Sequence, residues 1–405
     1  MALGVNRTST VAIWLLSRYD HLYRNGAIVA ASPESHPSWT PAPVHGSWDD
    51  LLDGVETPEA WAGKREKVEQ RFHDLLRNDA APDMPSDPQL ELEREWDAGG
   101  FRVEYVSYNV ETDERAHAYI AVPGGEIPGG GFPAVICLHG TTNWGARRTL
   151  GISPEPDDPH AKKNGGQVNG LDYARQLVRR GYVTISPEHF CCAARLPKEG
   201  PFETAAFYRK HPDWSAAGKY VHDSRIALRV LASRSDVDSE RLGVTGHSLG
   251  GHGSIWLAAS DERIRCASPS AGGLTFRENP APLHWSRDHW YIYFPQLRER
   301  FLAGEKITCD FHEQMALFAP RPLLERFALN DGDPVSEAHR VGLHLKLHEL
   351  YRLLGAEDAH AFMVFGDGHS IPVLSMENML TWMDRWLKHD GRALGGWDGT
   401  ACPAS

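Results

Sequence analysis

The stretch that decides the fold reads Gly246-His247-Ser248-Leu249-Gly250-Gly251. It lies between an apolar run at residues 242–245, which predicts a buried strand, and a helical pattern at 249–259. The pattern G-x-S-x-G between a strand and a helix indicates a sharp turn that presents a nucleophilic serine. Such a turn leaves little room for side chains, so glycine is favoured around it, and the N-terminus of the next helix favours developing negative charge. We therefore expect Ser248 to be a nucleophile.

A serine hydroxyl reacts only when a base takes its proton, and the later part of the chain offers that base. His369 follows an expected strand at 361–365, and Asp333 lies in the turn after an expected strand at 323–329. The order serine, aspartate, histidine is the one that accompanies this kind of turn. Asp331 lies in the same turn. We favour Asp333 as the acid because Asp-Pro-Val after the strand resembles the turn that carries the acid in many hydrolases with a serine nucleophile. Asp331 is interpreted as a turn-forming residue.

The negative oxygen that forms during acyl transfer needs backbone N–H donors. One is expected from Leu249, directly after the nucleophile, and a second from Thr141 in the loop His139-Gly140-Thr141-Thr142. Glycine lets this backbone approach a substrate oxygen. His139 is interpreted as a structural residue that holds the loop.

Around these motifs the chain alternates strands and helices. Residues 101–106 and 116–122 predict an antiparallel pair, and 134–138 is an apolar run typical of a strand buried on both faces. Further strands and helices are expected, in chain order, at 171–180, 182–185, 216–233, 242–245, 249–259, 264–267, 323–329, 361–365 and from about 375. This alternation predicts a mostly parallel, doubly wound sheet with flanking helices.

Three segments lie outside that pattern. Residues 1–100 predict an N-terminal helical extension that packs on a catalytic domain at 101–390, with its clearest helix starting at Thr57-Pro58-Glu59. Residues 274–319 predict a lid insertion, and 391–405 a C-terminal tail.

The lid insertion is rich in aromatic residues. Trp290 and Tyr291 are candidates for lining a substrate pocket, and packing within the lid itself is an equally good interpretation. Glu188 and His189, at the end of the expected strand 182–185, are further candidates near the site.

Composition excludes some partners. The 405 residues carry a formal net charge of −12, which argues against nucleic acid or an anionic membrane as a partner. No apolar run reaches a membrane-spanning length, and 11–16 is interpreted as an amphipathic helix rather than a signal peptide. The six cysteines lack a disulfide spacing, so free thiols in a cytoplasmic protein are expected.

No cofactor or metal is expected. The chain has no glycine-rich nucleotide motif. His344 and His348 are four residues apart, as in a metal pair, but a solvated helix face is the better interpretation because no third ligand stands out.

Residues 101 to about 390 resemble the α/β-hydrolase fold, in particular the dienelactone hydrolase and acetyl xylan esterase-like group. The segments that carry the resemblance are 137–141, 237–251 and 318–324. Dienelactone hydrolases proper use a cysteine where this chain has Ser248. Acetyl xylan esterases of the cephalosporin-deacetylase type carry Arg-Gly-Gln where this chain has Ser186-Pro187-Glu188-His189-Phe190.

The resemblance implies a serine hydrolase that cleaves a carboxylic ester through an acyl-enzyme, with a small-molecule ester or an acylated carbohydrate as substrate. The alternatives are an amidase or peptidase with the same triad, and a non-catalytic binding protein that keeps the fold. The oligomeric state is open, with a homo-oligomer among the options. Because His369 must be neutral to act as a base, activity should fall below about pH 6–7.

Overall fold

The computed structural model describes most of the chain. The described residues are 51–391, apart from 143, 153–169, 274, 277–281, 289, 306, 308, 333 and 390. All of them belong to one compact unit. The helix expected at 11–16 and nearly all of the C-terminal tail lie outside the described residues.

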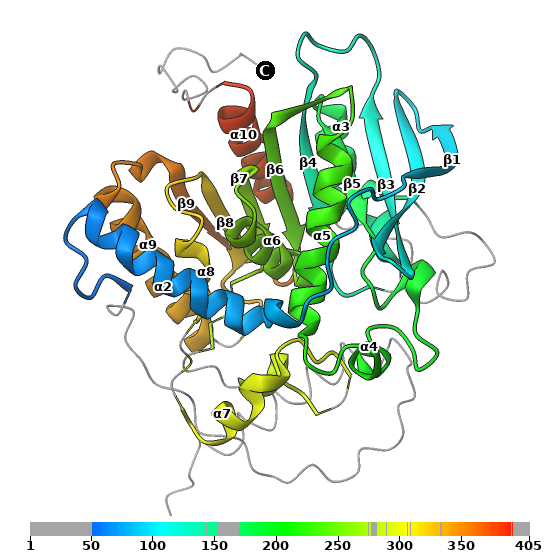
Figure 1. Cartoon of the computed structure of the whole chain (residues 1–405). Coiled ribbons are helices and arrows are strands. Elements are labelled where there is room, and N and C mark those ends of the chain that lie inside the picture. The colour runs from blue at the N-terminus through cyan, green and yellow to red at the C-terminus, as the bar shows by residue number, and fades with distance from the viewer. Residues whose placement is uncertain are drawn as a thin grey trace, which may run out of the picture. The chain divides into compact units, whose positions relative to one another are not determined.

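A nine-stranded sheet forms the centre of the described unit, in the order β1-β2-β3-β5-β4-β6-β7-β8-β9 (Figure 1). Its strands are β1 (Glu91–Asp97), β2 (Phe101–Glu111), β3 (Glu114–Pro123), β4 (Phe132–Leu138), β5 (Val183–Pro187), β6 (Val237–His247), β7 (Ile264–Ser270), β8 (Leu323–Ala328) and β9 (His360–Phe365). The strands β1, β2, β3 and β5 pair antiparallel, and all pairings from β5 through β4 to β9 are parallel. The predicted mostly parallel sheet and the predicted antiparallel pair at its start are confirmed.

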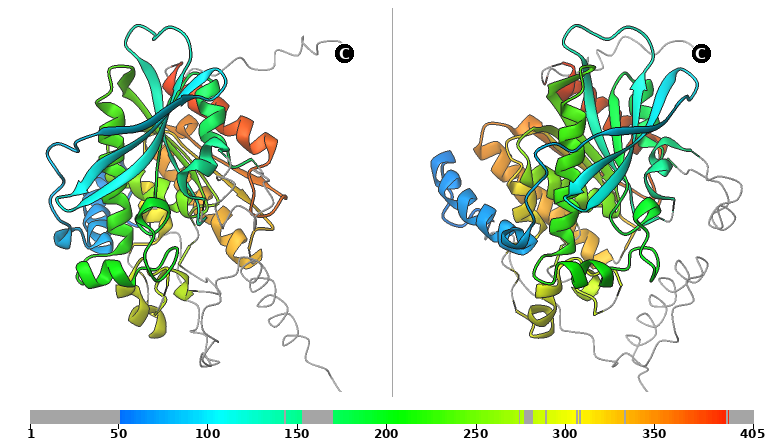
Figure 2. Two further views of the ribbon diagram at one scale, coloured as in Figure 1. Left: turned by 90° about the vertical axis from the view of Figure 1, so that its right-hand side faces the viewer. Right: turned by 45° about the vertical axis from the view of Figure 1, so that its right-hand side comes forward.

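Helices cover both faces of this sheet (Figure 2). The α-helices are α2 (Pro58–Leu76), α3 (Tyr173–Arg179), α4 (Ala205–Lys210), α5 (Ala216–Ala232), α6 (Leu249–Ser260), α7 (Arg298–Leu302), α8 (Phe311–Ala316), α9 (Pro334–Leu353) and α10 (Val373–Leu387). Short 3-10 turns are η2 (Asn78–Ala80), η3 (Gly145–Leu150), η4 (Ala193–Arg195), η5 (Pro282–Trp285), η6 (Pro295–Leu297) and η7 (Glu357–Ala359). One hydrophobic cluster joins the sheet to α2, α5, α6, α8 and α9, and a second joins it to α3 and α10.

The central strand β4 explains why both clusters exist. All seven of its residues are buried, and successive side chains point to opposite faces. Ile136 therefore lies in the first cluster and Cys137 in the second. The continuous apolar run in the sequence is the consequence of helices on both sides of this strand.

The N-terminal part of the described chain is tied to the sheet. Helix α2 begins as expected, with the Thr57 side chain accepting the N–H of Ala60 at 3.2 Å. Its Arg71 pairs with Glu313 of α8 at 2.6 Å, and the Ser215 hydroxyl before α5 donates to the Leu76 carbonyl at 2.7 Å. The helix thus packs against α5 and α8 of the described unit.

Strand β1 lies inside the segment expected to be a helical extension, so that part of the expectation is wrong. Its sequence, Glu91-Leu92-Glu93-Arg94-Glu95-Trp96-Asp97, is almost entirely exposed at the edge of the sheet. A charged edge strand buries too little apolar surface for its sequence to alternate between apolar and polar residues. Its charges also disfavour pairing with another chain.

The expected lid, 274–319, contains η5, η6, α7 and α8. Helix α8 begins with a capping box, in which the Asp310 carboxylate accepts a backbone N–H and Glu313 reaches back to the Asp310 N–H at 3.0 Å. Because α8 packs against α6, the end of the insertion belongs to the core.

Two further expectations concern the described residues. None of their helices combines the length and apolarity that a bilayer crossing requires. The five cysteines among them are free and buried, as expected, and Cys402 lies outside the described part.

Candidate active site

The candidate nucleophile Ser248 forms the turn between β6 and α6. Its backbone angles are φ 60° and ψ −121°, a conformation that a residue with a side chain rarely adopts. Two backbone hydrogen bonds hold it, because the Ser248 N–H donates to the Ser270 carbonyl at 2.9 Å and its carbonyl accepts the His252 N–H at 3.0 Å. The strained turn expected from the sequence is therefore present, and it raises this serine out of the strand.

Glycines around this turn are required by close backbone approach. A Cβ on Gly246 or Gly250 would collide with the Leu138 carbonyl oxygen, and one on Gly251 would collide with the Ser270 carbonyl oxygen. Since backbone cannot move aside as a flexible side chain can, these positions exclude every larger residue. The glycine pattern in the sequence is thus the mark of β4, β6 and α6 meeting at one point.

The loop after β4 lies against Ser248. Leu138 of β4 pairs with Gly246 of β6, so both strands end at the same edge of the sheet. A Cβ added to Gly140 would lie 3.0 Å from the His247 carbonyl oxygen and 3.4 Å from the Ser248 Cβ. Leu249 starts α6 on the other side of the serine. The two candidate oxyanion donors, Leu249 and Thr141, therefore come from neighbouring strand ends.

His139 holds this loop from beneath. Its Nε2 accepts the His189 backbone N–H at 3.1 Å, so the proton of the neutral ring is on Nδ1, which donates to the Gly140 carbonyl at 2.8 Å. Burial lowers the pKa of His139 to about 4, which keeps the ring neutral. These contacts agree with the structural interpretation of His139.

The candidate base His369 is paired with Asp331. The His369 Nδ1 lies 2.8 Å from the Asp331 Oδ2. The sequence-based choice of acid was Asp333, which lies outside the described residues, and the interpretation of Asp331 as only turn-forming is wrong. The parallel pairing of Ala328 with Phe365 brings the two loops together because both strands end at the same edge.

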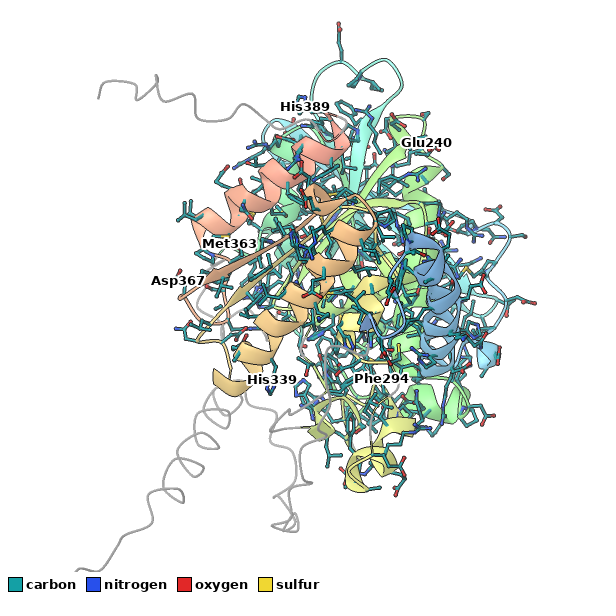
Figure 3. All side chains as sticks on the ribbon, turned by 90° about the vertical axis from the view of Figure 1, so that its left-hand side faces the viewer. Glu240, Phe294, His339, Met363, Asp367 and His389 are labelled. Carbon is teal, nitrogen blue, oxygen red and sulfur yellow. The ribbon has the colours of Figure 1, made fainter. Side chains whose placement is uncertain are left out.

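A second contact between these loops fixes their spacing. The Gly368 N–H donates to the Asn330 side-chain oxygen at 2.8 Å. Figure 3 marks Met363 within β9 and Asp367 in the loop beyond its end. The His369 ring also lies 4.5 Å, centroid to centroid, from the ring of His247, the residue before the nucleophile. The structure therefore brings the loop of His369 to the turn at Ser248.

A buried arginine, which no sequence pattern predicted, supports the strands below the turn at Ser248. The guanidinium of Arg326 on β8 donates to the Ser268 carbonyl at 3.1 Å, to the Thr245 hydroxyl at 3.4 Å and to the Ser375 carbonyl at 3.2 Å. Burial lowers its pKa to about 9. It links β6, β7, β8 and α10 beneath the turn at Ser248.

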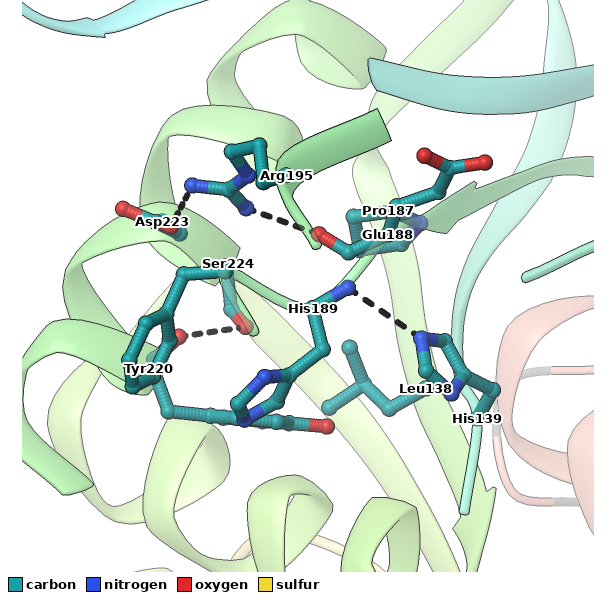
Figure 4. Close-up of a pocket in the computed structure, with 10 residues that line it drawn as sticks. Leu138, His139, Pro187, Glu188, His189, Arg195, Tyr220, Asp223 and Ser224 are labelled. Carbon is teal, nitrogen blue, oxygen red and sulfur yellow. Dashed lines mark hydrogen bonds and ion pairs between the residues drawn. The ribbon is translucent and has the colours of Figure 1, made fainter. Parts of the chain in front are cut away.

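The candidates Glu188 and His189 are buried and line a small pocket beside the site (Figure 4). Glu188 accepts the Ala194 N–H at 3.1 Å, and burial raises its pKa. His189 accepts the Cys191 N–H on Nδ1 at 3.1 Å, so its Nε2 proton faces the Tyr293 hydroxyl at 2.8 Å. Both side chains have partners inside the fold, and their role toward a substrate stays a prediction.

Trp290 and Tyr291 come from the lid segment and do pack against other lid rings. The Trp290 indole N–H donates to the Pro201 carbonyl at 3.0 Å. Tyr291 is only 5% exposed, and its ring centroid lies 4.6 Å from that of Tyr293. Its hydroxyl also lies 3.1 Å from the Thr141 hydroxyl. Tyr291 therefore both packs within the lid segment and lies close to the candidate site.

The expected solvated histidine pair on α9 needs correction. His348 is exposed, but His344 is buried, with Nε2 hydrogen-bonded to Glu325 and Nδ1 3.3 Å from His360. Its partners come from β8 and β9, which the helix spacing could not reveal. Within the described part of the chain, no group of three or more histidine, cysteine or acidic side chains is arranged to hold a metal ion.

Comparisons with known proteins agree with this fold. The model of the dienelactone hydrolase family matches residues 164–281, which contain the elbow. A putative hydrolase of Bacillus subtilis (strain 168), YtaP, is 25% identical over 293 residues, 70% of this chain and 88% of that protein. The carbohydrate esterase MZ0003, from an unknown prokaryotic organism, is 27% identical over 135 residues, 31% of each chain.

Solved structures are similar over most of the chain. A glucuronoyl esterase from Solibacter usitatus has a TM-score of 0.64 at 17% identity, over 86% of this chain and 98% of that one. A putative acetyl xylan esterase from Bacteroides fragilis NCTC 9343 has a TM-score of 0.57 at 14% identity, over 84% of each chain. At these identities the likeness establishes the fold alone.

The chain therefore has the α/β-hydrolase fold. Its resemblance to the dienelactone hydrolase and acetyl xylan esterase-like group is confirmed, and the comparisons support the predicted enzyme class, a carboxylic ester hydrolase.

Proposed function

We propose that this chain is a serine esterase that cleaves a carboxylic ester by two-step acyl transfer, with Ser248 as the nucleophile. The observation that carries the proposal is the strained backbone of Ser248, at φ 60° between a strand and a helix. Strain of this kind persists where the surrounding structure enforces it, and it exposes the hydroxyl to a reactant.

In the first step His369 takes the Ser248 proton while the hydroxyl oxygen attacks the ester carbonyl carbon. We take Asp331 as the acid in place of Asp333, because it is the carboxylate hydrogen-bonded to His369 Nδ1. That bond puts the proton on Nδ1 and leaves Nε2 as the acceptor. The carboxylate then stabilises the imidazolium that forms.

The tetrahedral intermediate collapses when His369 gives its proton to the leaving alkoxide, which departs as an alcohol. Water, deprotonated by the same imidazole, then attacks the acyl-enzyme and releases the acid and free Ser248. In both steps the N–H groups of Leu249 and Thr141 would bind the negative oxygen. Such donors are worth roughly 10²–10³-fold in rate each.

For the substrate we propose an ester carried by a carbohydrate. The support is the likeness to a carbohydrate esterase in sequence, and to a glucuronoyl esterase and a putative acetyl xylan esterase in fold. Trp290 packs against Tyr291, whose hydroxyl lies 3.1 Å from the Thr141 hydroxyl, and an aromatic ring near that loop could stack on a sugar ring.

The test is hydrolysis of p-nitrophenyl acetate, butyrate and octanoate by the purified chain and by its Ser248→Ala variant. We expect turnover that falls by at least about 10³-fold in the variant, because the nucleophile is removed. Acetylated xylan and a methyl ester of a uronic acid would then be compared as carbohydrate substrates. Equal turnover by the variant, or none on any ester, would overturn the proposal.

A further inference from the structure

A side-chain contact joins the lid segment to the loop after β4. The Tyr291 hydroxyl lies 3.1 Å from the Thr141 hydroxyl, across 150 residues of sequence. Thr141 is the candidate second donor of the oxyanion site, and it follows Gly140, which lies against the Ser248 Cβ. The effect of this contact on the loop therefore bears directly on the candidate oxyanion site.

The lid end of the contact is held firmly. Tyr291 has φ 57° and the preceding Trp290 has φ 43°, so two consecutive residues with side chains adopt the left-handed conformation. The Tyr291 N–H donates to the Phe202 carbonyl at 3.1 Å, and the Trp290 indole donates to the Pro201 carbonyl at 3.0 Å. Rotation of the backbone at this point is therefore opposed on both sides.

Packing fixes the Tyr291 ring as well. The ring lies among those of Tyr293 at 4.6 Å, Trp285 at 5.8 Å and Phe202 at 6.1 Å, and the Arg287 guanidinium lies 5.1 Å from its centroid. A phenol held this way can aim its hydroxyl with little loss of freedom.

The loop end of the contact needs such support. His139 restrains the loop at Gly140 through its carbonyl, one residue before Thr141. The Gly140 carbonyl and the Thr141 N–H belong to one peptide plane, which Gly140 leaves free to rotate, so a hydrogen bond on the Thr141 side chain adds a second restraint at the other end of that plane.

We propose that Tyr291 is a positioning residue: its hydroxyl holds Thr141 so that the Thr141 N–H faces the oxygen on which charge develops. This inference rests on the proposed esterase function, since it assigns Tyr291 a role in the same oxyanion site. Tyr291 acts through Thr141 and need not touch the substrate.

The experiment compares four variants of the full chain with the native enzyme: Tyr291→Phe, Thr141→Val, the double variant and Tyr208→Phe. The last is the matched control, because the Tyr208 hydroxyl donates to the carbonyl of Ile292, the residue after Tyr291, at 3.0 Å. It loosens the same lid segment without touching Thr141. The readouts are kcat, KM, melting temperature and inhibition by a trifluoromethyl ketone, which forms a tetrahedral oxyanion on the serine.

We expect Tyr291→Phe to lower kcat and weaken trifluoromethyl ketone inhibition by the same factor, about tenfold, with KM nearly unchanged. This is part of the roughly 10²–10³-fold that loss of one oxyanion donor costs. Thr141→Val should match it, and the double variant should be no worse than either single one, because all three remove the same contact. Tyr208→Phe should lower the melting temperature alone.

Native kcat and native ketone inhibition in folded Tyr291→Phe would overturn the inference while leaving the esterase proposal intact. Equal losses in Tyr208→Phe would also overturn it, by assigning the effect to lid packing. Absence of Ser248-dependent turnover in the native chain would remove the esterase proposal and this inference together.

Discussion

The proposed nucleophile and the proposed acid–base pair are held in place by different means, although both lie at the same edge of the sheet. Around Ser248 the backbone of β4, β6 and α6 meets at glycines, and the neighbouring rings of His139 and His247 are each 3% exposed. His369, in contrast, has a side chain that is 48% exposed, and its position depends on contacts between two loops.

Because of this difference, we expect the two sides of the site to respond differently to substitution. The nucleophile side is set by local backbone geometry, so small steric changes there should be severe. The acid–base side is set by one charged hydrogen bond between loops that have room around them. It should therefore tolerate a larger side chain and be sensitive to the loss of the charge that makes this hydrogen bond. The predictions below test this contrast, from the largest expected effect to the smallest.

The largest effect is expected from adding one methyl group beside the nucleophile. In Gly250→Ala the new Cβ would collide with the Leu138 carbonyl oxygen. Because backbone on both sides must shift, we expect a loss of roughly 3 kcal/mol or more in stability and little or no esterase activity. Thermal unfolding and p-nitrophenyl acetate turnover would measure both.

Gly366→Ala is the matched variant on the acid–base side. No atom lies within 4 Å of a Cβ at this position, between β9 and His369. We expect native-like activity and a melting temperature at least as high as that of the native chain. If both alanine variants behaved alike, the contrast in steric tolerance would be lost.

The second prediction concerns the acid. Asp331→Asn removes the charge that orients and stabilises His369 while keeping the side-chain volume, and we expect kcat to fall by roughly 10³–10⁴-fold. The melting temperature should change little, because the hydrogen bond joins two partly exposed side chains.

Asp333→Asn provides the internal comparison, since it removes a carboxylate from the same turn. We expect it to keep most of the activity. A larger loss in Asp333→Asn than in Asp331→Asn would restore the sequence-based assignment of the acid.

The same contrast explains which features of the fold and the site could be predicted from the sequence. The turn at Ser248 was predictable because close approach to the backbone of Leu138 and Ser270 requires glycines that stand together in the sequence, and β4 because a strand buried on both faces is apolar throughout. The exposed strand β1 was missed, since its side chains meet water and carry no period.

The acid could not be read in this way. Asp331 and Asp333 lie in one turn, and local sequence does not say which carboxylate faces a loop 38 residues away. The burial of His344 against Glu325 and the contact of Tyr291 with Thr141 have the same cause, since each joins elements that only the folded sheet brings together. Functional residues that are defined by tertiary contacts can therefore be identified only from the structure.

The smallest effect of a substitution is expected on the pH dependence of stability. On the nucleophile side burial lowers the pKa of His139 to about 4, and it holds the pKa values of His189, His247 and His252 well below their usual range. In the unfolded chain each imidazole takes a proton near its ordinary value of 6.5. The unfolded state therefore binds more protons between about pH 6.5 and 4, and stability must fall as the pH falls through that window.

For His139 alone the shift corresponds to about 3 kcal/mol across the whole window. Glu188, whose pKa burial raises, acts in the opposite direction, but it is one group against several. Urea unfolding at pH 7, 6 and 5 should therefore show a steady loss of free energy, and His139→Gln should reduce its slope by about one proton. The variant also loses loop contacts, so its absolute stability at pH 7 should be lower and only the slope reports protonation. A native slope in this variant would mean that the His139 ring is protonated equally in both states, and that the nucleophile side is not closed to charge.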